Sequence, residues 1–374
     1  MTSRSRGWVV GRIAGAPVLV TPSWFLGAVV LTLVFAPSVR TWFAPHMPTT
    51  GVLVVAFSFV LLLFASVFLH EVAHALVARR RGHQVTELAL TLWGGHTAYT
   101  GAGARPLDGA LVAVVGPLTN LVLAGAFWVA FQLQPTAGTV PAALLLAGAF
   151  SNAFVGFFNL LPGLPLDGGQ ILESIVWGAT GSRSRGTLAA GWVGRAVAVA
   201  VLAWALLWPL LEGRRPSWVM VVWGALIGAF LWSGAGDAIK GAQARARVAT
   251  LSARGLAVPA VAVPVATTVA GVSAAAARNP GVVVAVVGPA GEPVGWVDPA
   301  AVANVPAARA DLTPVEAVVV PFPPGSAVTP DLEGDALLDR LARGSSGARV
   351  VPVVEGGRVT GVLDVARVAA ALRR

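Results

Sequence analysis

The chain has 374 residues, of which 56% are hydrophobic and only 11% are charged, with a mean hydropathy of +0.76. Soluble domains carry about 25% charged residues, so this composition excludes a water-soluble globule, and the absence of cysteine excludes disulfides and thiolate metal sites. The net charge of +9 comes from short arginine clusters between apolar blocks, a pattern typical of membrane topology rather than of nucleic-acid binding.

The first segment, residues 8–20, is β-rich and contains glycine, and it is too short to cross a bilayer as a helix. Residues 83–104 have the same character. Such backbone is tolerated at membrane depth only when it is buried in protein or lines a wet cavity. We therefore expect the two segments to pair as strands at the cytoplasmic boundary. The alternative is two ordinary cytoplasmic loops.

Six apolar blocks are long enough to span a bilayer as helices. They cover residues 22–37, 52–78, 108–132, 140–161, 188–211 and 217–234. No signal-peptide cleavage site follows the first block, so we expect it to remain as an anchor.

The basic residues between these blocks predict their orientation. Four clusters fall on one side of the membrane if both termini are cytoplasmic: Arg4, Arg6 and Arg12; Arg79–Arg81; Arg183 and Arg185; and Lys240, Arg245 and Arg247. Arg214 and Arg215 would fall on the other side. The positive-inside rule therefore favours a multi-pass protein of the plasma membrane with both termini in the cytoplasm.

The sequence HEVAH, residues 70–74, lies near the end of the second block. Ionisable side chains are costly inside a bilayer, so they mark a functional site by default. On a helix, positions i and i+4 share one face, so His70 and His74 can bind one metal ion. Glu71 is then placed to activate a water molecule at that ion. The pattern predicts an intramembrane zinc hydrolase.

A catalytic zinc site usually has three protein ligands, and the candidate third ligand is Asp167 in the sequence NLLPGLPLDGG, residues 159–169. The second and fourth blocks run in the same direction, so the two histidines and this aspartate should lie at similar depth near the cytoplasmic side. The prolines interrupt the helix, and the paired glycines allow close backbone approach. The sequence therefore predicts that the three side chains converge.

The sequence resembles the site-2 protease family of intramembrane zinc metalloproteases, and within it the bacterial branch with C-terminal cystathionine-β-synthase (CBS) domains. HEVAH and NLLPGLPLDGG are the pair of motifs that carry the resemblance. GPLTN at residues 116–120 and GRIAGAPVLVTPSW at residues 11–24 support it, and the resemblance covers roughly residues 10–235. One departure is Thr21, because related sequences often have a histidine before this Ser-Trp pair.

The resemblance implies one Zn²⁺ per chain. The implied metal ligands are His70, His74 and Asp167. It further implies that Glu71 is the general base and that Asn159 is a catalytic residue that stabilises the site. Residues 83–104 resemble a re-entrant loop that presents the substrate in extended form. The implied function is regulated intramembrane proteolysis, in which a transmembrane segment of a protein such as an anti-sigma factor is cut near the cytoplasmic face.

Two further residues have open interpretations. His96 is either an additional metal ligand from the re-entrant segment or a polar loop residue, and we favour the second. Asn120 faces the core from the third block, so we expect it to hydrogen-bond across helices rather than to act in catalysis.

From about Val248 the composition changes to short valine-rich runs, Pro and Gly turns and dispersed charge. Residues 286–298 and 353–364 form a weak internal repeat that predicts a strand, a glycine turn, a strand and a short helix in each copy. The pair resembles tandem CBS modules. Asp298 and Asp364 stand where such modules commonly have a hydroxyl residue for nucleotide contact, so we expect dimerisation or gating instead of nucleotide binding.

The predicted architecture is a polytopic α-helical membrane protein with about six transmembrane helices and a re-entrant β region, followed by a C-terminal α+β tandem CBS-like domain. The expected domains are a metalloprotease at residues 1–240 and a regulatory domain at residues 248–374. The expected partners are the lipid bilayer, a transmembrane protein substrate and a second copy bound through the CBS-like domain, without nucleic acid.

Two alternatives from other functional classes remain. The first is a CBS-regulated transporter, which is disfavoured because the polar residues gather in one cytoplasmic-side cluster. The second is a catalytically silent relative that binds membrane partners, which the intact Glu71 disfavours.

Overall fold

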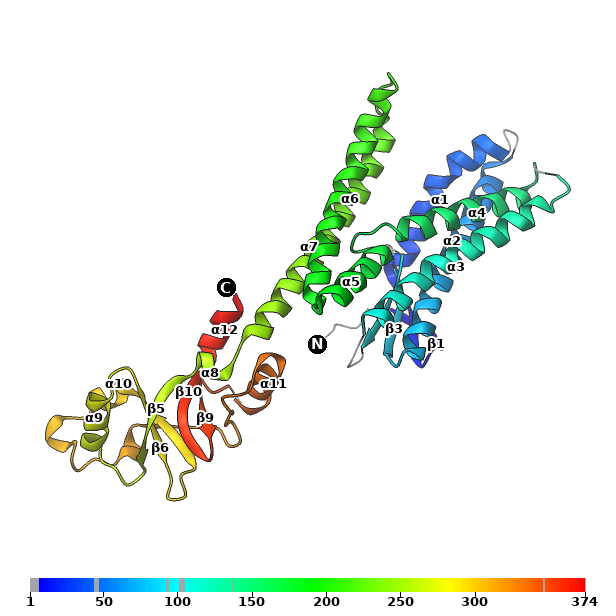
Figure 1. Ribbon diagram of the computed structural model, residues 1–374. Coiled ribbons are helices and arrows are strands. Elements are labelled where there is room, and N and C mark those ends of the chain that lie inside the picture. Colours follow the sequence, from blue (N-terminus) through cyan, green and yellow to red (C-terminus); the bar gives the residue numbers. More distant parts are fainter. Residues whose placement is uncertain are drawn as a thin grey trace. The chain divides into compact units, whose positions relative to one another are not determined.

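The computed structural model describes residues 7–43, 47–91, 94–100, 105–136, 138–345 and 347–373. The chain divides into two compact units, the first ending at Ala242 and the second beginning at Gln243 (Figure 1). The assignment of a protease function to the first unit and a regulatory function to the second stays a prediction.

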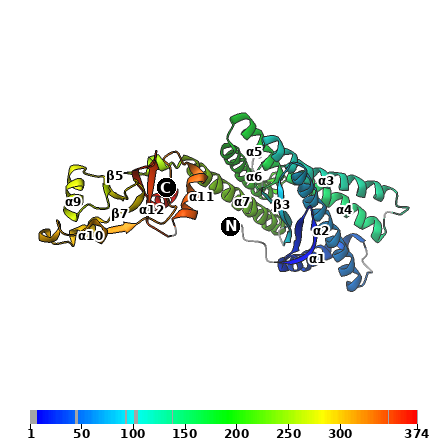
Figure 2. The same cartoon turned by 90° about the horizontal axis from the view of Figure 1, so that it is seen from below.

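Helices dominate the first unit. They are α1 (Pro22–Phe43), α2 (Thr49–Arg80), α3 (Pro106–Gln132), α4 (Val140–Asn159), α5 (Asp167–Thr180), α6 (Arg183–Leu211) and α7 (Trp218–Thr250). Within the described residues, all except α5 are long and apolar enough to cross a membrane, six in total. The six predicted spans are therefore confirmed as helices. Figures 1 and 2 both show α3 and α4 side by side as an antiparallel pair.

The largest difference from a predicted helix boundary lies at the end of α7. The apolar block that begins at residue 217 was expected to end at 234, but α7 continues to Thr250. The added turns carry Asp237 and Lys240 on an exposed face, and alanine recurs between the charges. Alanine has the highest helix propensity, so the helix continues after the apolar pattern stops.

A four-stranded sheet accompanies these helices. Its strands are β1 (Trp8–Ile13), β2 (Ala16–Val20), β3 (Gln84–Thr91) and β4 (Gly94–Thr100), in the order β1-β2-β3-β4. β2 and β3 pair in parallel, with Val18 opposite Leu88, whereas the other neighbours are antiparallel. The predicted pairing of the two β-rich segments is confirmed. Residues 92–93 and 101–104 of the second segment lie outside the described residues.

The sheet packs on the helix that carries HEVAH. Val18 and Leu88 form a buried cluster with Ala16 and with Ala75 of α2. Burial of this apolar cluster fixes the sheet beside the second half of α2. As a result β4, at the end of the sheet, lies next to the charged end of that helix.

The segment between α4 and α5 is held by close backbone contacts. The amide N–H of Leu164 donates to the carbonyl of Ala190 in α6 at 3.1 Å. A Cβ on Gly168 would collide with the carbonyl oxygens at the end of α4, and a Cβ on Gly169 would collide with the backbone of Leu164. The expected close approach at the paired glycines is confirmed, and it sets where α5 and its first residue, Asp167, begin.

Helices α6 and α7 pack through small residues. Gly224 of α7 lies against Ala205, and Gly228 approaches the carbonyl of Ala198. Small side chains allow membrane helices to approach closely.

The second unit is an α+β domain. Its helices are α8 (Ala253–Leu256), α9 (Val269–Arg278), α10 (Pro299–Ala303), α11 (Gly334–Gly344) and α12 (Val365–Arg373). Its strands are β5 (Val258–Pro264), β6 (Val283–Val287), β7 (Pro293–Val297), β8 (Val319–Pro321), β9 (Val350–Glu355) and β10 (Arg358–Asp364), in the sheet order β8-β7-β6-β5-β10-β9.

The predicted internal repeat is confirmed as two hairpins, β6–β7 and β9–β10, each followed by a short helix. The loop of the second hairpin is Gly356-Gly357, and both residues have positive φ. A two-residue loop of this kind is the type I′ turn that fits the twist of antiparallel strands.

Candidate metal centre

Two imidazoles and one carboxylate converge inside the first unit. The Nε2 atoms of His70 and His74 lie 3.0 Å apart, and they lie 3.2 Å and 3.4 Å from Oδ2 of Asp167. All three residues are buried. Tetrahedral zinc with bonds of about 2.0–2.1 Å would separate its ligand atoms by roughly 3.3 Å. The described group therefore has the spacing and the donor atoms of a metal site.

Hydrogen bonds orient both imidazoles toward the aspartate. Nδ1 of His74 lies 2.7 Å from the carbonyl oxygen of Val112, which can only accept, so Nδ1 carries the proton. Nδ1 of His70 lies 2.5 Å from Oδ1 of Asn120, which accepts in the same way. Both Nε2 lone pairs are thereby available to a metal. Such outer contacts are typical of metal-binding histidines.

The contact to His70 continues into a buried polar chain. Nδ2 of Asn120 donates to Oδ1 of Asn152 at 2.9 Å, and Nδ2 of Asn152 donates to Oγ of Ser66 at 3.0 Å. The expected cross-helix role of Asn120 is confirmed. The sequence reasoning missed Asn152, although an asparagine within an apolar span was a usable signal.

Gly116 of α3 makes room for the centre. A Cβ at this position would lie 2.6 Å from Nε2 of His70 and would also collide with Nε2 of His74. Any larger residue would enter the space where the ligand atoms meet. The glycine of the GPLTN sequence is therefore a steric requirement of the site.

Glu71 is held beside the same centre by the edge of the sheet. Oγ1 of Thr97 in β4 donates to Oε2 of Glu71 at 2.7 Å, and Gly95 packs against the glutamate side chain. Glu71 is buried and lines one cavity of about 690 Å³ together with His70 and Asp167. Thr97 gave no signal in the sequence, because threonine is common in strands.

Asn159 and His96 also line this cavity but are not in the group of ligand atoms. Asn159 is the half-buried last residue of α4, and Asn120 is the asparagine that contacts His70. The imidazole of His96 is 49% exposed, and its Nε2 lies 3.3 Å from Oε1 of Glu87. This geometry favours the interpretation of His96 as a polar residue.

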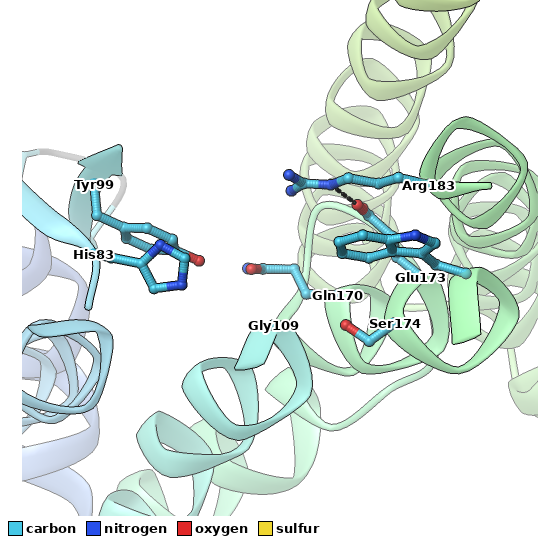
Figure 3. Close-up of a pocket in the computed structure, with 8 residues that line it drawn as sticks. His83, Tyr99, Gly109, Gln170, Glu173, Ser174 and Arg183 are labelled. Atoms are coloured by element: carbon cyan, nitrogen blue, oxygen red, sulfur yellow. Dashed lines mark hydrogen bonds and ion pairs between the residues drawn. The ribbon is translucent and has the colours of Figure 1, made fainter. Parts of the chain in front are cut away.

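A smaller cavity of about 130 Å³ adjoins the first and shares Tyr99, Gln170 and Arg183 with it (Figure 3). Figure 3 shows Tyr99 on one side, with Gln170 and Arg183 on the other. Nε2 of Gln170 donates to Oδ1 of Asp167 at 3.3 Å, and Nε of Arg183 donates to Glu173 at 2.8 Å. Burial raises the pKa of Tyr99, so its hydroxyl stays protonated near neutral pH.

The chain matches known proteins across this centre. Peptidase family M50 matches residues 58–140 and 131–203. The protein sll0528 of Synechocystis sp. is 34% identical over 255 residues, which cover 67% of this chain and 64% of that protein. This chain thus spans slightly less than two thirds of that relative. YwhC of Bacillus subtilis is 32% identical over 193 residues, 42% of this chain and 87% of YwhC. Both relatives are named as zinc metalloproteases.

Among solved structures, the chain is similar to the site-2 protease from Methanocaldococcus jannaschii, with 24% identity and a TM-score of 0.42 over 62% of this chain and 94% of that one. It is also similar to the CBS domain of a Sphaerobacter thermophilus membrane protein, with 19% identity and a TM-score of 0.29 over 37% of this chain and 96% of that one. Because the family match contains the candidate ligands and the identity extends over most of YwhC, the chain belongs to peptidase family M50, the site-2 protease family.

Proposed function

We propose that the protein is a zinc-dependent endopeptidase that cuts transmembrane segments of other proteins. The observation that supports this most directly is the convergence of His70, His74 and Asp167 beside Glu71 in one cavity. When bound by these three residues, zinc supplies Lewis acidity, which polarises a peptide carbonyl and lowers the pKa of a water molecule.

Glu71 would act as the general base. The hydroxyl of Thr97 holds Oε2 of its carboxylate, so the group is fixed in one orientation. A carboxylate held beside the scissile bond can take a proton from water and pass it to the leaving amine. Val112 and Asn120 keep the two imidazoles in the tautomer that can bind metal.

The substrate would bind as an added strand. β4 is at the end of the sheet order, and its residues from Gly94 to Tyr99 line the larger cavity. A transmembrane helix must unwind before it can be cut, and its freed backbone groups need new partners. Pairing with β4 would supply them by β-augmentation. By the family resemblance, an anti-sigma factor is the expected type of substrate.

We further propose that both termini are cytoplasmic, in line with the basic clusters, and that Asn159 supports the site from the cavity wall. The tandem repeat at residues 248–374 would act as a dimerisation or gating module.

The test uses the full-length protein in detergent, with a transmembrane peptide as substrate. Wild type should contain one zinc per chain, and His70→Ala and Asp167→Ala should lose it. Glu71→Gln should keep the zinc but lose cleavage. The matched control is His96→Ala, which removes an imidazole from the same cavity and should retain the zinc. The proposal would be refuted if Glu71→Gln cleaved the peptide at the wild-type rate, or if Asp167→Ala kept its full zinc content.

A further inference from the structure

Arg195 is a charged residue within the apolar part of α6. It is the only charged residue between 188 and 211. In the part of the chain that the structure describes, its Nε is buried without a hydrogen-bond partner. The nearby acid on α7, Asp237, lies 3.9 Å from Lys240, and both of these side chains are exposed. A membrane arginine without a carboxylate partner points to a functional role.

Two indole rings enclose the guanidinium group. Its central carbon lies 4.9 Å from the ring centroid of Trp192 and 4.9 Å from that of Trp232 on α7. Trp192 and Trp232 are 58% and 48% exposed, so the cluster lies at the surface of the helix pair. A ring face attracts a cation but does not replace a strong acceptor for the five N–H donors of arginine. The cluster therefore combines a positive charge with an unpaired N–H donor in an aromatic setting.

The position along the helix places this cluster near a lipid headgroup. Roughly 24 Å of helix separates Arg195 from Leu211, and the hydrocarbon core of a bilayer is about 30 Å thick. Long arginine side chains can extend from such a depth to the headgroups. The headgroups concerned are those at the end of α6 and α7 that carries Arg183 and Lys240.

We propose that Arg195, Trp192 and Trp232 bind the phosphate of an anionic phospholipid in that leaflet. Basic pockets between transmembrane helices are suited to such headgroups. Gly236 of α7 lies beside the guanidinium, since a Cβ added there would be in ordinary van der Waals contact with Nη2 of Arg195, at 3.5 Å. The proposal depends on α6 and α7 spanning a bilayer and not on peptidase activity.

The location connects this lipid site to the metal centre. Gly194, the residue before Arg195, packs against the carbonyl group of Leu164, and Ala190 accepts the hydrogen bond from the Leu164 amide. The same turns of α6 therefore hold the segment that leads to Asp167. A bound lipid would lie on the outer side of those turns.

The experiment is native mass spectrometry of the full-length protein, titrated with phosphatidylglycerol or with zwitterionic phosphatidylcholine. We expect Arg195→Gln to bind the first phosphatidylglycerol roughly tenfold more weakly than wild type, because a charge-assisted hydrogen bond is lost. Binding of phosphatidylcholine should not change. The matched control is Arg40→Gln, which removes an exposed arginine from α1 and should behave as wild type.

The experiment includes a second variant and a competition with inorganic phosphate. Trp192→Ala changes an exposed residue and keeps the cation, so a folded sample is available even if Arg195→Gln does not fold, and it should also weaken binding of phosphatidylglycerol. Excess inorganic phosphate should not displace the lipid. The proposal is overturned if both variants bind phosphatidylglycerol as wild type does, if phosphatidylcholine binds equally well, or if inorganic phosphate competes fully.

Discussion

Among the described residues, the two units differ in how many polar side chains they bury. In the first, His70, His74, Asp167, Asn120 and Asn152 are all buried, and each has a polar partner. In the second, the two main cores consist of valine, leucine and alanine. Among the residues described in that unit, Ser326 is the single buried polar one. Burial of polar groups costs free energy unless they are paired. A paired polar network within apolar helices therefore indicates chemistry, whereas an apolar core indicates stability.

The largest expected effect comes from filling the metal centre. Gly116→Ala adds a methyl group where the two imidazoles meet, so the bound zinc should fall from one per chain toward zero and cleavage should be lost. Gly125→Ala on the same helix is the matched control, because nothing lies within 4 Å of the added carbon. Metal analysis of both purified variants checks this, and full zinc content in Gly116→Ala would contradict it.

A core change in the second unit should act on stability alone. Leu363 is fully buried in β10, so Leu363→Ala should cost about 2–5 kcal/mol through the cavity it leaves. Arg254→Ala, which breaks an exposed ion pair with Glu355, should cost at most about 1 kcal/mol. Hydrogen exchange of the β9–β10 amides measures both. If Leu363→Ala also lost its zinc, the second unit would affect the metal centre, and the prediction of an effect on stability alone would be wrong.

Removal of an orienting partner should weaken metal binding without abolishing it. Asn120→Ala leaves Nδ1 of His70 without its acceptor, and loss of such outer contacts typically costs about 10–100-fold in metal affinity. Thr119→Val is the control, since the Thr119 hydroxyl bonds only within its own helix, to the carbonyl of Val115. Competition with a zinc chelator gives the affinities, and equal values for the two variants would argue against this role of Asn120.

The smallest expected effect concerns the sheet edge. Thr97→Val removes the hydroxyl that holds Glu71, which should lower the rate of cleavage roughly tenfold with zinc content unchanged. Thr100→Val, an exposed position on the same strand, should leave the rate as in wild type. If the two variants cleave the transmembrane peptide equally fast, β4 does not position the base.

Much of the fold was accessible from local patterns. Six apolar blocks predicted six helices, because bilayer thickness demands a minimum length of apolar chain. The repeat at residues 286–298 and 353–364 predicted two hairpins with following helices. The helix α5 was not predicted as a separate element, and the end of α7 was placed too early, since neither is marked by a change in the apolar pattern.

The amino-acid sequence by itself determined the membrane class, the pairing of His70 with His74 one turn apart, and Asp167 as the distant candidate. Those features depend on residue type and on spacing along one element, which periodicity reveals. Only the tertiary structure decided that Val112, Asn120 and Asn152 orient the imidazoles and that Thr97 holds Glu71. The physical reason is that these contacts join residues far apart in the chain, and the packing of helices and sheet selects them among many equally polar candidates.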